Sequence, residues 1–61
     1  MQTIEKTLFS IKGNVLGEVI SVDNDYGFFH VETSTEQFGF DSVDAAYDAL
    51  FVFHTEYFES L

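Results

Sequence analysis

Residues 43–61 read VDAAYDALFVFHTEYFESL, and this stretch decides the fold. Apolar and aromatic side chains recur in it every three or four residues, which is the period of one face of an α-helix. The members of this stripe are Val43, Ala46, Tyr47, Leu50, Phe51, His54, Tyr57, Phe58 and Leu61. Asp41 or Ser42 can cap the first turn, and Asp44 within it suits the positive end of the helix dipole. We therefore predict one long amphipathic helix, about 30 Å in length.

Four further apolar residues of this segment fall outside the stripe: Ala45, Ala49, Val52 and Phe53. One interpretation is a broad core-facing stripe with scattered exposed apolar side chains, which are common on protein surfaces. The other is a second contact surface, because a chain of 61 residues has little sheet with which to cover two faces of a long helix. We favour the second interpretation and predict that these four residues form a homodimer interface.

The chain before the helix is typical of β-strands. Residues 15–22 are rich in β-branched side chains, residues 23–27 form a turn cluster, and residues 28–33 return as an apolar run. These segments predict an antiparallel hairpin. A turn over residues 34–36 and a short strand over residues 37–40 then lead into the helix.

The N-terminal segment allows two interpretations. Ile4, Leu8 and Ile11 have helical spacing, and Gly13 could end such a helix. Thr7 and Phe9 with their neighbours suit instead a strand that turns at Gly13 and Asn14. Either choice predicts a single α+β domain over residues 1–61, a small antiparallel sheet of three or four strands with the long C-terminal helix packed on one face.

The composition combines a one-signed charge with many aromatic residues. Eleven acids stand against two lysines, for a net charge of −9, while eight phenylalanines and three tyrosines provide material for a core. So short a domain without cysteines needs dense aromatic packing or association with another chain, and we expect a homodimer. Without a basic leader or a membrane-length apolar run, we expect a soluble cytoplasmic protein, in the host cytoplasm if a phage encodes it.

The acids of the helix segment are the candidate binding residues. Residues 41–61 contain no basic side chain, and like charges one helical turn apart, as at Asp44 and Asp48, weaken an isolated helix. One interpretation is a solvated face that keeps the protein soluble. The other, which we favour, is a charge array that binds the basic surface of a larger protein, for example a nucleic-acid enzyme. The predicted partner-binding residues are Asp41, Asp44, Asp48, Glu56, Glu59 and, as an aromatic anchor, Tyr26.

The remaining candidate sites have simpler structural explanations. His30 and His54 could bind a metal or act as a proton switch if they converge, but such histidines are more often partly buried and hydrogen-bonded. Residues 23–27 faintly resemble a calcium loop. However, the segment has five residues, whereas an EF-hand loop has about twelve, and strands flank it instead of helices, so we favour a hairpin turn with Tyr26 near its tip. We predict no catalytic residue, metal or cofactor, and no direct binding of nucleic acid or membrane, which a charge of −9 would oppose.

In size, acidity and lack of cysteine the chain resembles the short proteins with which phages and mobile elements inhibit host nucleic-acid machinery, including anti-restriction and anti-CRISPR inhibitors. That resemblance implies a non-enzymatic inhibitor or modulator, such as an anti-defence protein or DNA mimic, that blocks a basic nucleic-acid-binding or regulatory surface of a host protein. The alternative is a small homo-oligomeric structural or assembly protein whose charge serves solubility.

Overall fold

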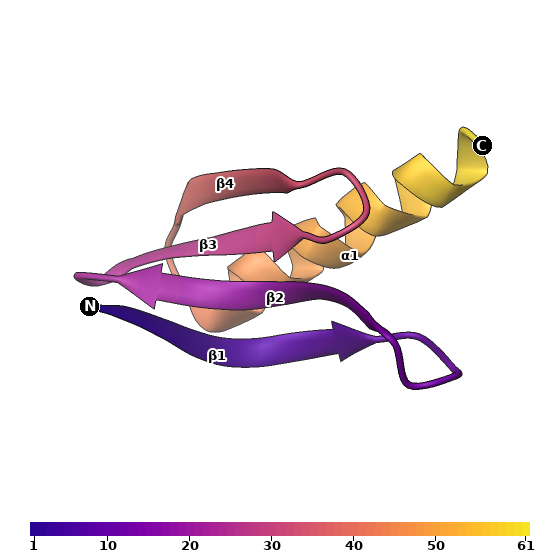
Figure 1. Ribbon diagram of the computed structural model, residues 1–61. Coiled ribbons are helices and arrows are strands. Elements are labelled where there is room, and N and C mark those ends of the chain that lie inside the picture. The colour runs from indigo at the N-terminus through magenta and orange to yellow at the C-terminus, as the bar shows by residue number, and fades with distance from the viewer.

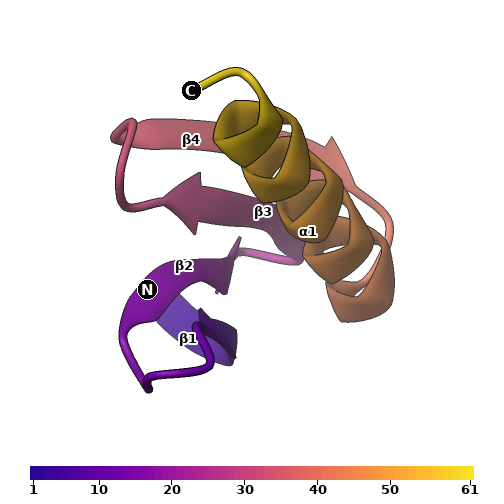
Figure 2. The same cartoon turned by 90° about the vertical axis from the view of Figure 1, so that its right-hand side faces the viewer.

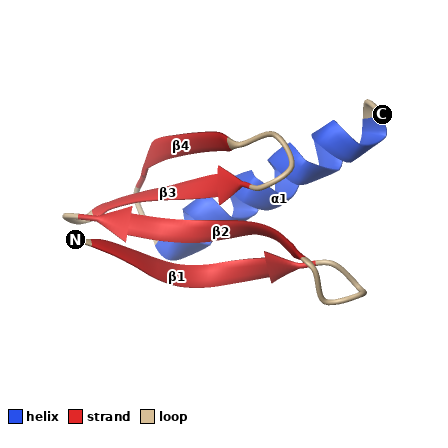
Figure 3. Ribbon diagram, in the orientation of Figure 1, coloured by secondary structure: helices blue, strands red, loops and turns tan.

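The computed structural model describes residues 1–61 as a four-stranded sheet with one helix (Figures 1 and 3). The elements are β1 (Gln2–Phe9), β2 (Val15–Val22), β3 (Asp25–His30), β4 (Thr35–Phe40) and α1 (Val43–Glu59). Neighbouring strands pair antiparallel in the order β1-β2-β3-β4, and α1 covers one face of the sheet (Figure 2). The predicted α+β fold is confirmed, and the N-terminal segment is a strand.

The two hairpin turns displace the predicted ends of β3 and β4. Asp23 and Asn24 have φ angles of 50° and 69°, the left-handed pair that a two-residue type I′ turn requires. Because the turn needs only these two residues, β3 begins at Asp25, three residues earlier than predicted, and ends at His30. The next turn occupies residues 31–34, with Ser34 at φ 54°, so β4 begins two residues earlier than predicted.

A bulge at Gly39 turns two side chains of β4 toward α1. Gly27 pairs with Phe38 but Tyr26 pairs with Phe40, so Gly39 is an extra residue in the strand. Its φ of +98° is one that residues with a side chain rarely adopt. In a regular strand, residues three apart point to opposite faces, but the bulge allows Gln37 and Phe40 to line the same hollow beside α1.

The core lies between the sheet and α1. Its buried members come from β1, β2, β3 and α1, and they are Leu8, Val19, Phe28, Ala46 and Leu50. Ser42 caps the helix by accepting a hydrogen bond from the Ala45 amide at 3.1 Å. Gly17 allows the close approach of α1, because a Cβ at this position would lie 2.7 Å from Leu50 Cδ1. No helix of the structure combines the length and the apolar content needed to cross a membrane.

The buried stripe of α1 differs from the predicted one. Phe53 and Ala49, which we had placed outside the stripe, pack against the core, whereas Phe51 and Phe58 are 56% and 67% exposed. Four members of the predicted stripe are retained: Val43, Ala46, Leu50 and Tyr57. Together with Phe53 they form a second stripe that has the same alternation of three and four residues and leaves out Phe51 and Phe58. Spacing alone does not distinguish the two stripes, and contact with the sheet selects the second.

Candidate functional site: an acidic groove between α1 and β4

The charges of this protein are segregated across the sheet. Residues 1–12 contain both lysines and one acid, Glu5, so the remaining ten of the eleven acids lie in residues 13–61 without a basic partner. Lys6 lies in β1, where its ammonium is 4.0 Å from the centroid of the Tyr47 ring, and Lys12 lies in the loop that follows. Since β1 and β4 are opposite edges of the sheet, the β4 edge is the one without positive charge.

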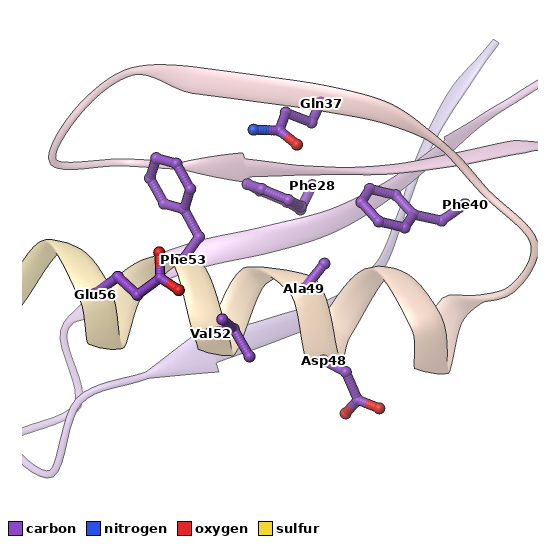
Figure 4. A pocket seen from close by; sticks show the side chains of 8 residues that line it. All are labelled: Phe28, Gln37, Phe40, Asp48, Ala49, Val52, Phe53 and Glu56. Carbon is purple, nitrogen blue, oxygen red and sulfur yellow. The ribbon is translucent and has the colours of Figure 1, made fainter.

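A hollow of about 400 Å³ opens between α1 and β4 at that edge (Figure 4). It arises because α1 packs mainly over β3 and β2 and least over β4. Eight residues line it, five of them apolar, and they are Phe28, Gln37, Phe40, Asp48, Ala49, Val52, Phe53 and Glu56. We call this hollow the acidic groove.

The acidic groove combines an aromatic floor with charges on its helix side. Phe28 forms the floor, and its ring centroid is 5.9 Å from that of Phe40 and 5.6 Å from that of Phe53. Figure 4 shows the Glu56 carboxylate beside Phe53 and the Asp48 carboxylate pointing away from the floor. An apolar side chain could therefore be buried in the groove while a neighbouring cation meets a carboxylate.

The structure brings together only part of the predicted binding residues. Asp48 and Glu56 line the acidic groove, and Asp44 lies one helical turn before Asp48. Asp41 is exposed in the connection between β4 and α1, and Glu59 borders a different hollow beside His54.

Tyr26 does not lie at an exposed hairpin tip. It is in β3, where its half-buried side chain packs against the core, because the type I′ turn is complete before it. Tyr26 does not line the acidic groove.

Three of the four residues predicted at a dimer interface belong to the same groove: Ala49, Val52 and Phe53. Val52 is 53% exposed, while Ala49 and Phe53 are partly buried against the core. Ala45 is exposed one turn before Ala49. Ala49, Val52 and Phe53 therefore share the groove with Asp48 and Glu56, and their role in a dimer interface stays a prediction.

Sequence reasoning missed the residues that the sheet contributes to the groove: Phe28, Gln37 and Phe40. Strand alternation assigns Gln37 and Phe40 to opposite faces, so a pairing with α1 is not apparent from their spacing. The available signal was Gly39, since an isolated glycine within a strand pattern indicates a bulge.

On the other side of Phe53, the two histidines meet in the protein interior. His30 is fully buried, and its Nε2 lies 3.0 Å from Nδ1 of His54. His30 Nδ1 lies 2.9 Å from the hydroxyl of Thr33, which donates to the hydroxyl of Thr35 at 2.7 Å. The ring of His30 also contacts those of Phe53 and Tyr57 edge-on, with centroids 5.0 Å and 5.2 Å away. We call this group the histidine cluster.

The hydrogen bonds of the histidine cluster are consistent with one arrangement of its protons. With the Thr33 hydroxyl assigned as the donor to Thr35, Thr33 accepts from His30 Nδ1–H. In this arrangement His30 Nε2 accepts the Nδ1–H of His54. Burial lowers the pKa of His30, the neighbouring His54 lowers this pKa further, and Glu32 opposes both. Both histidines are hydrogen-bonded, His30 fully and His54 partly buried, as the simpler interpretation predicts, and they also converge, which was the condition for the alternative of a metal site or proton switch.

No protein family model, no curated protein and no solved structure matches this chain. We therefore infer the function of this protein from its residues and their geometry.

Proposed function

We propose that this protein is a non-enzymatic binding protein that inhibits or modulates a larger protein. It occupies a basic surface of its partner with the acidic groove and the adjoining acids of α1. Asp48 and Glu56 attract the basic surface, Asp44 extends the charged array by one turn, and the apolar lining provides the burial.

The observation that carries this proposal is that the acids without basic partners and the apolar hollow lie together. High net charge alone keeps a protein soluble and requires no particular arrangement. Here the lysines lie at the β1 edge, and an open hollow with aromatic residues in its lining lies beside unpaired acids at the β4 edge. Attraction of a basic surface and burial of apolar area are the two contributions that a protein-binding site needs.

The test is affinity capture from the natural host lysate at low and high salt, followed by quantitative mass spectrometry. Three forms of the protein serve as baits: wild type, a groove variant and a control variant. The groove variant carries Asp48→Asn and Glu56→Gln. The control variant carries Glu18→Gln and Asp23→Asn, which remove the same charge from β2 and its turn. We expect proteins that wild type and control capture equally, that elute with salt and that the groove variant loses. Equal capture by all three baits would contradict the proposal.

A second candidate function is homo-oligomeric assembly, because α1 also exposes large apolar side chains. Phe51, Val52 and Phe58 are each more than half exposed. Sedimentation at several salt concentrations tests this function: a stable oligomer that Val52→Asp or Phe51→Asp dissociates, and that neutralised acids leave intact, would favour assembly over partner binding.

A further inference from the structure

We propose that the occupant of the acidic groove is an extended segment of the partner protein, in which one large apolar residue lies between two basic residues at alternate positions. This inference rests on the proposed function and specifies the partner. In sequence terms the segment is basic–x–apolar–x–basic, and it runs along β4.

The apolar position follows from the lining of the groove. Val52 is 53% exposed and Ala49 and Phe53 are partly buried, so an inserted side chain would cover apolar surface that is open to solvent in this chain. Behind them, Phe28 and Phe40 provide an aromatic floor. Burial of a leucine- or phenylalanine-sized side chain is the largest favourable contribution that such a surface offers.

The basic positions follow from the spacing of the carboxylates. Asp48 and Glu56 are eight residues apart on α1, which corresponds to about 12 Å along the helix axis. In an extended chain, residues four apart on one face are about 13 Å apart, and the residue midway between them points to the same face. The spacing of the two basic residues therefore matches that of the two acids along the helix axis. Eight residues also turn the helix about 80° beyond two full turns, and Asp48 points away from the floor, so long, flexible lysine or arginine side chains are needed to reach both acids while the middle side chain enters the groove.

The extended conformation follows from the position of β4. It is an edge strand, so one side of its backbone is left without a neighbouring strand in this chain. Figure 4 shows β4 running alongside α1, so a strand added to this edge would place alternate side chains on the α1 side of the sheet. The bulge at Gly39 interrupts the edge, which leaves the residues from Thr35 to Phe38 for pairing.

The test is a selection of random 12-residue peptides, displayed on phage, against the immobilised full chain at low salt. We expect enriched peptides to share the basic–x–apolar–x–basic pattern. For the enriched peptides, Val52→Asp should weaken binding at least about tenfold, because it places a charge where the apolar side chain is buried. Phe51→Asp, which makes the same change at an equally exposed position outside the groove, should alter binding less than about twofold.

Hydrogen exchange of the complex tests the conformation. Backbone amides of β4 that are open to solvent in the free protein should become protected when the selected peptide binds. A selection that yields no binders, binders without basic residues, or binders that Val52→Asp does not affect would overturn the inference. Binding without protection of β4 would overturn the extended mode. Circular dichroism of both variants shows whether the fold is retained.

The outcomes separate this inference from the proposed function. If the selection fails but capture from lysate still requires Asp48 and Glu56, the protein binds a basic partner by its charge array and the groove is not the anchor. If peptides enter the groove but capture is independent of both acids, the groove chemistry stands and the proposed function is wrong.

Discussion

Phe53 lies between two regions that both combine aromatic rings with polar side chains, the histidine cluster and the acidic groove, and these two flanks differ in how their polar groups are paired. On one flank, the histidine cluster encloses the polar ring of His30, with each ring nitrogen within hydrogen-bond distance of a partner in the chain. On the other flank, the acidic groove leaves apolar surface open and its carboxylates without basic neighbours. A closed, internally satisfied cluster is what stability requires, whereas an open surface with unmatched charge is typical of a binding site. The first flank therefore contributes to folding, whereas the second has the features of the binding site that we propose.

The largest expected effect comes from opening the closed flank. His30→Ala removes a fully buried side chain and leaves Nδ1 of His54 without its hydrogen-bond partner. We expect the free energy of unfolding to fall by about 2–4 kcal/mol, from the lost packing and the lost hydrogen bonds. Urea denaturation followed by circular dichroism measures this change.

The matched control on the open flank is Gln37→Ala. Gln37 is exposed at the groove and has no side-chain hydrogen bond in the structure, so its stability change should stay within about 0.5 kcal/mol. Equal losses for the two variants would remove the distinction between a structural and a functional flank.

The residue shared by both flanks should show an intermediate effect. Phe53 contacts the rings of Phe28 and His30, so Phe53→Leu loses aromatic packing but retains most of the apolar volume. We expect a loss of about 1 kcal/mol in urea denaturation. Phe58→Leu, at a position that is 67% exposed, should cost far less, and a reversed order would show that α1 packs by the other stripe.

The closed flank should also make stability depend on pH. The fold holds the pKa of His30 below its ordinary value of about 6.5, chiefly through burial, so the unfolded chain binds a proton more readily than the folded one. Above about pH 6.5, His30 is neutral in both states, so it does not lower the free energy of unfolding. Stability falls, by at most about 1.4 kcal/mol per pH unit, as pH decreases from there toward the lowered pKa of the folded state.

Urea midpoints at pH 7.5 and 5.5 measure this dependence within a range that lies above the titration of ordinary carboxylic acids. His54→Gln is the control, because it removes the neighbouring imidazole that helps to lower the pKa of His30. We expect a smaller difference between the two midpoints in this variant. A wild-type midpoint that rises on acidification would contradict the assignment of a neutral, buried His30.

The sequence was sufficient to predict the fold class, and it also pointed to the helix residues that line the candidate site. The period of residues 43–61, the two candidate caps Asp41 and Ser42 and the turn cluster at residues 23–27 are local signals. The structure has a helix at Val43–Glu59 that Ser42 caps, and the turn uses Asp23 and Asn24. Local periodicity did not choose between two stripes of equal spacing, so we wrongly predicted that Phe51 lies on the core-facing stripe and Phe53 outside it. That choice depends on contacts with the sheet.

Of the residues that line the groove, only those on the helix could be predicted, because those from the sheet also depend on tertiary contacts. Asp48, Glu56 and Val52 come from the helix, whose unmatched acids and extra apolar residues the sequence displays directly. Gln37 and Phe40 come from β4, and they face α1 only because Gly39 shifts the strand by one residue. The meeting of His30 and His54, 24 residues apart, is likewise a tertiary contact with no local signal.

The smallest expected effect separates stability from binding on the open flank. Asp44 and Asp48 are one helical turn apart, and like charges at this spacing destabilise a helix by about 0.2–0.5 kcal/mol. Asp48→Asn should therefore raise the free energy of unfolding by a few tenths of a kcal/mol, and this gain should vanish in 1 M salt. The gain from Asp44→Asn should be smaller, because Asp44 also interacts favourably with the helix N-terminus.

In contrast, Asp48→Asn should weaken the binding of a groove-selected basic peptide. A residue that opposes folding slightly and supports binding is a functional residue, whereas a loss of stability with unchanged binding would make Asp48 a structural one.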